Sequence, residues 1–186
     1  MIDGVGDTRE LMTAEELLRL DLPGKSTELV RGKLVVREPP STYHGRVQST
    51  LNIIVGSYVR ANALGAVFGQ DTGFKIRSDP DSVRAPDLAF VHRQRVGQIG
   101  TRGYAALAPD LVAEILSPDD RPGDVLMKVA EWLDAGVTLV WVIDADRRTG
   151  TVYRSDGSVG TMAPGDDLDG ESVLPGFLCR ISELFE

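Results

Sequence analysis

The sequence contains few of the residues on which disulfide-rich, zinc-binding and membrane proteins depend. Its single cysteine, Cys179, excludes an intrachain disulfide and is typical of a reducing compartment. The only histidines are His44 and His92, too few for the usual closed zinc site. The longest apolar run, 139–143, is far shorter than the roughly 20 residues of a membrane-spanning helix. Because no secretory leader opens the chain either, we predict a cytoplasmic protein.

Basic residues are also in the minority. The chain has 20 Lys and Arg against 28 Asp and Glu, which gives a formal net charge of -8. This balance argues against a broad nucleic-acid-binding surface, which is normally basic. It leaves room for an enzyme with a local basic cleft or with a bound metal ion. A length of 186 residues with 42% hydrophobic residues suits one core, so we expect a single domain at 13–186 behind an N-terminal tail at 1–12.

Hydrophobic periodicity predicts an α/β protein. Apolar residues recur with helical spacing over 44–62 and over 124–135, and a capping box at Thr13 and Glu16 starts a short helix. Strand-like apolar runs occupy 28–31, 34–36, 66–68, 74–76, 87–91, 111–116, 139–143 and 151–153. We expect a loop-rich stretch at 157–170. Because strands outnumber helices, the predicted architecture is an α+β mixed sheet flanked by helices.

Two acidic residues fall inside these apolar runs. Asp87 opens the run that continues to residue 91, and Glu114 lies in the middle of 111–116. A carboxylate in such a segment is costly unless a partner compensates its charge. Two carboxylates that converge from neighbouring strands are typical of an oxygen-ligand Mg²⁺ site, which points to metal-assisted phosphodiester chemistry. The alternative is that either acid caps a strand end or pairs with an arginine.

Strand geometry decides which acids can cooperate. Side chains alternate along a strand, so Asp110 and Glu114 share a face but lie about 13 Å apart, too far to share one metal ion. Asp87 is on a different strand and can lie beside Glu114 if the two strands pair in register. We therefore predict that Asp87 is the partner of Glu114 and that Asp110 is a structural residue at a strand start.

The helix expected at 124–135 carries a further candidate. Lys128 lies at the edge of its apolar stripe and can reach into a cleft, where an ammonium group could place a water molecule or balance negative charge. The alternative is an ion pair with Asp124, one helical turn earlier. Trp132 is expected to serve core packing.

Two more polar residues are candidates for accessory roles. Glu28, in the first hairpin, could add a carboxylate to the site, although such a residue is often only solvated. His44 begins the long helix and could contact phosphate or assist proton transfer. Its alternative is an exposed helix-start position without a function.

The order of the sequence motifs is itself informative. The chain runs through Glu28-Leu29-Val30-Arg31-Gly32-Lys33-Leu34, His44 at a helix start, Pro86-Asp87-Leu88, Pro109-Asp110-Leu111-Val112-Ala113-Glu114-Ile115-Leu116-Ser117-Pro118, Asp124 with Lys128, and Gly136-Val137 before Trp141-Val142-Ile143-Asp144. In this order and spacing the motifs resemble the Uma-type family of restriction endonucleases, which belongs to the PD-(D/E)XK nuclease superfamily. The resemblance extends over residues 13–186.

This resemblance implies a restriction-endonuclease-like core that hydrolyses DNA phosphodiester bonds with Mg²⁺ or Mn²⁺. By position, Asp87 and Glu114 match the metal-binding acids, and the Ile115 backbone carbonyl matches a further ligand. The family pattern asks for a lysine two residues after the glutamate, where this chain has Leu116. We predict that Lys128 is the displaced lysine, because its helix directly follows the Glu114 strand. Cleavage of both DNA strands by two related sites would favour a homodimer.

The resemblance also gives Glu28 and His44 an accessory place at the rim of the site. Two other interpretations stay open. Leu116 in the lysine position and the acidic net charge favour a catalytically degenerate nuclease-fold module that binds or assembles with a partner. The acidic net charge conflicts less with a metal-dependent hydrolase that acts on RNA or nucleotides than with a DNA endonuclease.

Overall fold

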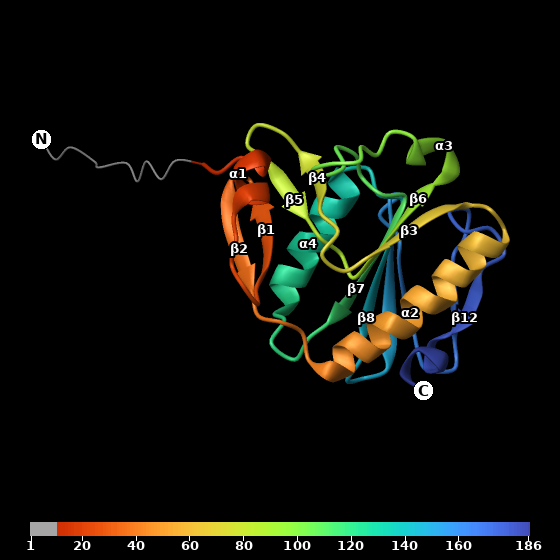
Figure 1. The fold of residues 1–186 in the computed structure, drawn as a ribbon. Helices are drawn as coiled ribbons and strands as arrows, with labels where there is room; N and C mark the ends of the chain where they lie inside the picture. Colours follow the sequence, from red (N-terminus) through yellow and green to blue (C-terminus); the bar gives the residue numbers. More distant parts are fainter. Residues whose placement is uncertain (1–10) are drawn as a thin grey trace, which may run out of the picture.

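Two β-sheets lie side by side, with helices around the larger one (Figure 1). The computed structural model describes residues 11–186. The larger sheet has the strand order β10-β9-β8-β7-β6-β3, the smaller has the order β2-β1-β5-β4, and β11 pairs with β12.

The strands are β1 (Ser26–Val30), β2 (Lys33–Arg37), β3 (Gly65–Gly69), β4 (Phe74–Arg77), β5 (Ser82–Arg84), β6 (Leu88–His92), β7 (Leu111–Leu116), β8 (Leu139–Asp144), β9 (Thr149–Arg154), β10 (Val159–Met162), β11 (Asp167–Asp169) and β12 (Leu178–Arg180). The helices are α1 (Ala14–Arg19), α2 (Thr42–Ala61), α3 (Arg93–Val96), α4 (Pro122–Asp134) and the 3₁₀ helix η1 (Ile181–Phe185).

The larger sheet is buried on both faces because its central strands are apolar throughout. Along β6, Leu88 and Phe90 belong to the core cluster that contains the buried face of α2. Ala89 and Val91 point the other way and belong to the cluster that contains the buried face of α4. The alternation of side chains along a strand therefore places one long helix on each face.

Strand register brings the two acid-bearing runs together. β6 and β7 are antiparallel, with Leu88 opposite Ala113, and β7 and β8 are parallel. One further step along the first pairing places Asp87 opposite Glu114. The predicted mixed sheet with flanking helices is thus confirmed, and so is the pairing of the two acidic strands.

The predicted strands at 66–68 and 74–76 are confirmed, in different sheets: β3 pairs with β6, whereas β4 pairs with β5 in the smaller sheet. Two other details of the predicted strand pattern differ from the structure. The sequence of β5, Ser82-Val83-Arg84, contains only one apolar residue and gives no strand signal. The stretch at 157–170 is not all loop, because it contributes β10 and β11 through backbone pairing with β9 and β12.

The predicted N-terminal tail at 1–12 lies almost wholly outside the described residues, and the single domain at 13–186 stays a prediction. A capping box confirms the start of α1: the Thr13 side chain accepts a hydrogen bond from the Glu16 backbone, and the Glu16 carboxylate accepts one from the Thr13 backbone. Within residues 11–186, every helix is too short or too polar to cross a membrane.

Candidate functional site

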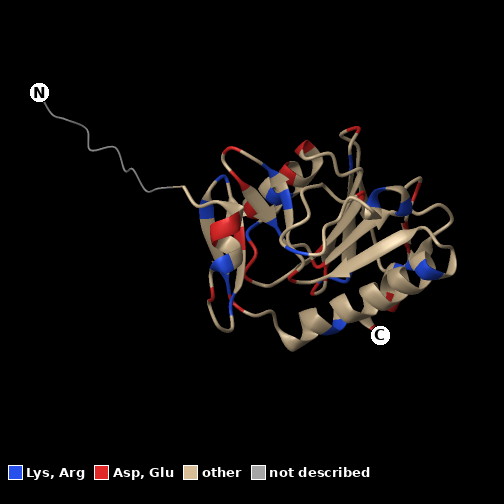
Figure 2. Ribbon diagram, turned by 45° about the horizontal axis from the view of Figure 1, so that its top comes forward, with Lys and Arg blue, Asp and Glu red and all other residues tan. Residues whose placement is uncertain are grey.

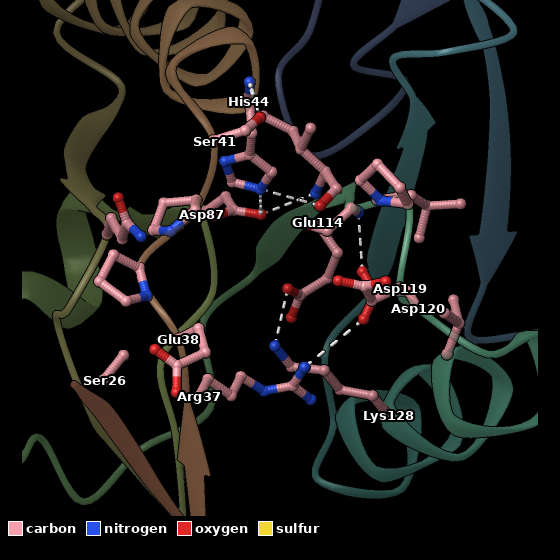
Figure 3. Close-up of a pocket in the computed structure, with 18 of the residues that line it drawn as sticks. Ser26, Arg37, Glu38, Ser41, His44, Asp87, Glu114, Asp119, Asp120 and Lys128 are labelled. Carbon is pink, nitrogen blue, oxygen red and sulfur yellow. Dashed lines mark hydrogen bonds and ion pairs between the residues drawn. The ribbon is translucent and has the colours of Figure 1, made fainter.

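A cleft of about 580 Å³ lies between the smaller sheet and the adjoining ends of β6, β7, α2 and α4 (Figure 3). The ionisable side chains that line it are Glu28, Arg37, Glu38, His44, Asp87, Glu114, Asp119, Asp120, Asp124 and Lys128. All the residues that the sequence singled out for the site, including Ile115, therefore lie around one cavity. Asp110 is elsewhere, as predicted, and accepts hydrogen bonds from the His92 backbone and from Arg95.

Asp87 is held rigidly at the start of β6. Its Oδ2 accepts a hydrogen bond of 2.7 Å from the backbone N–H of Ile115, on the neighbouring strand. Its backbone carbonyl accepts hydrogen bonds from the side chains of Gln48 and Asn52, at 3.1 and 3.2 Å. Both of these amides project from α2, so the sheet and the helix together fix the position of the carboxylate.

Glu114 is a buried acid on the floor of the cleft. Its Oε2 accepts a hydrogen bond of 2.8 Å from Lys128 Nζ, and its Oε1 accepts one of 2.8 Å from the Trp132 indole. Burial raises the pKa of Glu114 to about 7, and although Lys128 opposes this rise, the negative charges of Asp87 and Glu28 add to it. The contacts of Glu114 with its neighbours therefore stabilise its ionised form only in part.

Lys128 reaches the cleft floor from the first half of α4. Its Nζ lies 2.8 Å from Glu114 Oε2 and 3.4 Å from Glu28 Oε1. Among the described ion pairs, Lys128 contacts these two acids, so the alternative pairing with Asp124 is wrong. Burial lowers the pKa of Lys128, but the charges of Glu114 and Glu28 outweigh it and raise the pKa above its usual value. The ammonium form is thus the stable one at this position.

Glu28 is buried in the wall of the cleft, with 2% exposure, and does not lie at the rim as predicted. Its Oε2 accepts a 2.8 Å hydrogen bond from Arg84, and its Oε1 accepts a 3.0 Å bond from the Ala85 backbone. Although burial raises the pKa of Glu28, Lys128 and Arg84 lower it to about 2 overall. Glu28 is therefore a permanent anion that holds one side of Lys128.

His44 is also buried, so the exposed helix-start position considered for it is wrong. Its Nε2 donates to the Ile115 carbonyl at 3.0 Å and lies 3.4 Å from Asp87 Oδ2. Burial lowers the pKa of His44, but the hydrogen bonds to Asp87 and Ile115 and the negative charge of Asp87 together outweigh it and leave the pKa raised. The imidazole thus contacts two of the three groups that the sequence predicted as metal ligands.

The sequence did not identify three residues that position the acids. Gln48 and Asn52 lie one helical turn apart on α2 and hold Asp87. In the sequence, the sign of this role was the presence of two amide side chains on the inward, otherwise apolar side of the long helix. Trp132 is fully buried, as expected of a core residue, but it also orients Glu114, for which the sequence offers no signal.

Replacement of Trp132 by phenylalanine removes the indole N–H that donates to the buried Glu114 carboxylate. Beyond the loss caused by the smaller ring, this should lower the free energy of unfolding by about 1.5–3 kcal/mol. Chemical denaturation at pH 8 measures the loss. Trp141→Phe is the matched control, since Trp141 is equally buried and its indole N–H has no hydrogen-bond partner among the described residues. Equal losses in the two variants would show that the bond to Glu114 contributes nothing.

The donor set at the end of β6 and β7 fits a hard divalent cation. It comprises the carboxylates of Asp87 and Glu114 and the Ile115 carbonyl, which are the oxygen ligands that Mg²⁺ prefers. The strand pairing that brings the two carboxylates together supports the fit, because a cation would offset the repulsion between their charges. Within residues 11–186, no group of three or more His, Cys, Asp or Glu side chains is gathered closely enough to hold a metal ion on its own.

Comparisons with known proteins identify the family and the fold. A family model, Uma2, described as "Putative restriction endonuclease", matches residues 14–182. The crystal structure of "a putative nuclease belonging to DUF820" from Anabaena variabilis is 25% identical in sequence and superimposes with a TM-score of 0.79, covering 94% of this chain and 97% of that one. Comparison with curated proteins gave no match. Because the family model covers almost the whole chain, this protein belongs to the Uma2 family of putative restriction endonucleases.

Proposed function

We propose that this protein is an Mg²⁺- or Mn²⁺-dependent endonuclease that hydrolyses DNA phosphodiester bonds in the cleft between its two sheets. The observation that carries the proposal is the convergence of Asp87, Glu114 and Lys128 at one end of the cleft, with Nζ 2.8 Å from Glu114. Two acids and a lysine in one cleft are the side chains that metal-assisted phosphodiester hydrolysis needs. The family's description supports the same class of reaction.

Asp87, Glu114 and the Ile115 carbonyl are the groups that would hold the cation. When bound, it would polarise the scissile phosphate and lower the pKa of a water molecule. Asp87 is ready for this role because the Ile115 N–H already fixes its carboxylate. Glu114 has to exchange its contact with Lys128 for the cation, and the Trp132 indole keeps its other oxygen in place during that exchange.

Lys128 takes the role of the lysine that Leu116 cannot fill. Leu116 lines the cleft but carries no charge, whereas the ammonium group of Lys128 reaches the same floor from α4. Released from Glu114, it would place the attacking water and balance negative charge on the phosphate in the transition state. Glu28 keeps Lys128 protonated and aimed at the floor, and His44 steadies the Asp87 carboxylate.

Several broader proposals accompany this one. We propose that the protein acts as a homodimer, because cleavage of both strands of a duplex needs two sites related by a twofold axis. A single cysteine supports a location in the cytoplasm. Residues 13–186 would form one domain, supported by a family match that extends from 14 to 182.

The proposal is tested by nicking of supercoiled plasmid with Mg²⁺ or Mn²⁺. Asp87→Asn and Glu114→Gln should each reduce the rate by at least about 10²–10³-fold, since each removes a charge that acts at the reacting phosphate. Asp110→Asn is the matched control: it alters the other Pro-Asp-Leu sequence, outside the cleft, and should leave the rate unchanged. Equal nicking by wild type and both acid variants would contradict the proposal and indicate contamination.

Cleavage assays on RNA and nucleotides, together with calorimetry, separate the two alternative functions. A metal-dependent hydrolase of RNA or nucleotides would cleave those substrates, but not plasmid, through the same acids. A degenerate nuclease-fold module, which Leu116 favours, would bind Mn²⁺ in calorimetry but cleave none of the three substrates.

A further inference from the structure

We propose that Arg37 is a substrate-binding residue that holds a backbone phosphate of the nucleic acid next to the reacting centre. The inference rests on the proposed nuclease function and adds to it a contact outside the predicted set of site residues. It identifies the wall of the cleft formed by β2 as the wall along which the phosphate backbone runs.

Arg37 spans the mouth of the cleft. It is the last residue of β2, opposite Ser26, and its side chain extends toward the loop between β7 and α4 (Figure 3). There its Nη1 lies 3.5 Å from Asp120 Oδ1, while its Nε lies 3.5 Å from Glu28 Oε2. The side chain remains 42% exposed, so a ligand that enters the cleft meets its guanidinium group directly.

Among the described residues that line the cleft, Arg37 is a cation whose N–H donors are largely unused. Lys128 is held 2.8 Å from Glu114, and His44 is buried against the Ile115 carbonyl. Both contacts of Arg37 are at 3.5 Å, the outer limit of a hydrogen bond, and a guanidinium group has five N–H donors. Its planar fork matches two phosphate oxygens at once, which an ammonium group cannot do.

The acidic lining of the cleft means that a phosphate can bind there only beside a cation such as Arg37. Lys and Arg are interspersed with Asp and Glu over the molecule (Figure 2), and Glu38, Asp119, Asp120 and Asp124 all line the cleft. A phosphate that approached these acids would be repelled unless a cation stood between them. Arg37 stands on the wall opposite the 119–120 loop, where it provides that charge.

Asp120 makes the contact with the Arg37 guanidinium group that we assign to the phosphate. Its Oδ1 faces Arg37, while its Oδ2 accepts a 2.8 Å hydrogen bond from the Ser117 backbone. The loop therefore holds Asp120 in place whether or not Arg37 contacts it. A phosphate oxygen can displace a single contact of 3.5 Å without disturbing the loop, and the guanidinium group turns from the carboxylate to the substrate.

The test is the affinity for a short fluorescent DNA duplex, measured by anisotropy over a series of salt concentrations, with Ca²⁺ in place of Mg²⁺ to prevent cleavage. Arg37→Ala should weaken binding about tenfold, the effect of one charged hydrogen bond. It should also reduce the slope of log affinity against log salt by about 0.9, the value for one phosphate contact. Arg37→Lys should keep the slope and recover part of the affinity, and Asp120→Asn should bind several times more tightly than wild type.

Arg180→Ala is the matched control, because Arg180 is an exposed arginine that pairs with Asp167 and lies outside the cleft. Thermal unfolding verifies that Arg37→Ala is folded, as expected from the remaining partners of Glu28. If wild type binds the duplex and Arg37→Ala matches it in affinity and slope, the inference is overturned and the nuclease proposal stands. If wild type neither binds nor cleaves the duplex, the proposed function itself fails, and this inference fails with it.

Discussion

Replacement of Lys128 by methionine is expected to slow DNA cleavage by about 10²–10³-fold at saturating Mg²⁺, because a preorganised charge at the reacting phosphate is lost. Methionine keeps most of the volume of the side chain and removes only the ammonium group. Affinity for Mn²⁺ should stay the same or rise, since Glu114 no longer has to leave an ion pair to bind the cation. Single-turnover cleavage and calorimetry measure the two effects separately.

A slower rate without a loss of metal affinity is what distinguishes a catalytic role of Lys128 from a structural one. If Lys128 only neutralised buried acids, Lys128→Met would destabilise the fold but leave the rate of the folded fraction unchanged. Lys128→Arg restores the charge with a different shape and should recover part of the rate. A Lys128→Met enzyme that cleaves as fast as wild type would return Lys128 to the role of an ion-pair partner for Glu114 and Glu28.

The sequence was informative where an acidic residue interrupted an apolar strand. Asp87 and Glu114 stood out because the strands around them are buried on both faces, and two such strands become neighbours in one sheet. The reach of Lys128 followed from its place at the edge of the apolar stripe on α4. Each of these inferences needs only local periodicity and one assumption about strand pairing, which the register of β6 and β7 meets.

Contacts between residues far apart in the sequence were beyond such reasoning. Arg84 lies in a three-residue strand with one apolar neighbour, and nothing local indicates that it reaches Glu28, 56 residues earlier. For the same reason Glu28 resembled a solvated hairpin residue, although it is buried. Arg37 contacts Asp120 across 83 positions. The smaller sheet brings these charges together, and its strand order depends on the whole fold.

The charges inside the cleft wall should also make a large contribution to stability. Arg84 donates to Glu28 and, at 2.8 Å, to Glu131 on α4, and all three groups are largely shielded from water. Arg84→Met leaves the Glu28 carboxylate buried with weaker partners, which should lower the free energy of unfolding by about 3–5 kcal/mol at pH 7. Urea denaturation measures the loss. Arg180→Met, which breaks an exposed pair, should cost about 1 kcal/mol or less.

The pH dependence of this loss identifies Glu28 as its source. The pKa of Glu28 is about 2 in the folded protein against 4.5 for the free side chain. Its ionised form therefore contributes about 3 kcal/mol that is fully present above pH 4.5 and declines as the pH falls toward 2. In Arg84→Met the folded pKa rises toward the free value, so the gap between the two proteins should be widest above pH 5 and shrink steadily in acid. A gap that stayed constant from pH 7 to pH 3 would attribute the loss to packing around Arg84 instead of to the charge of Glu28.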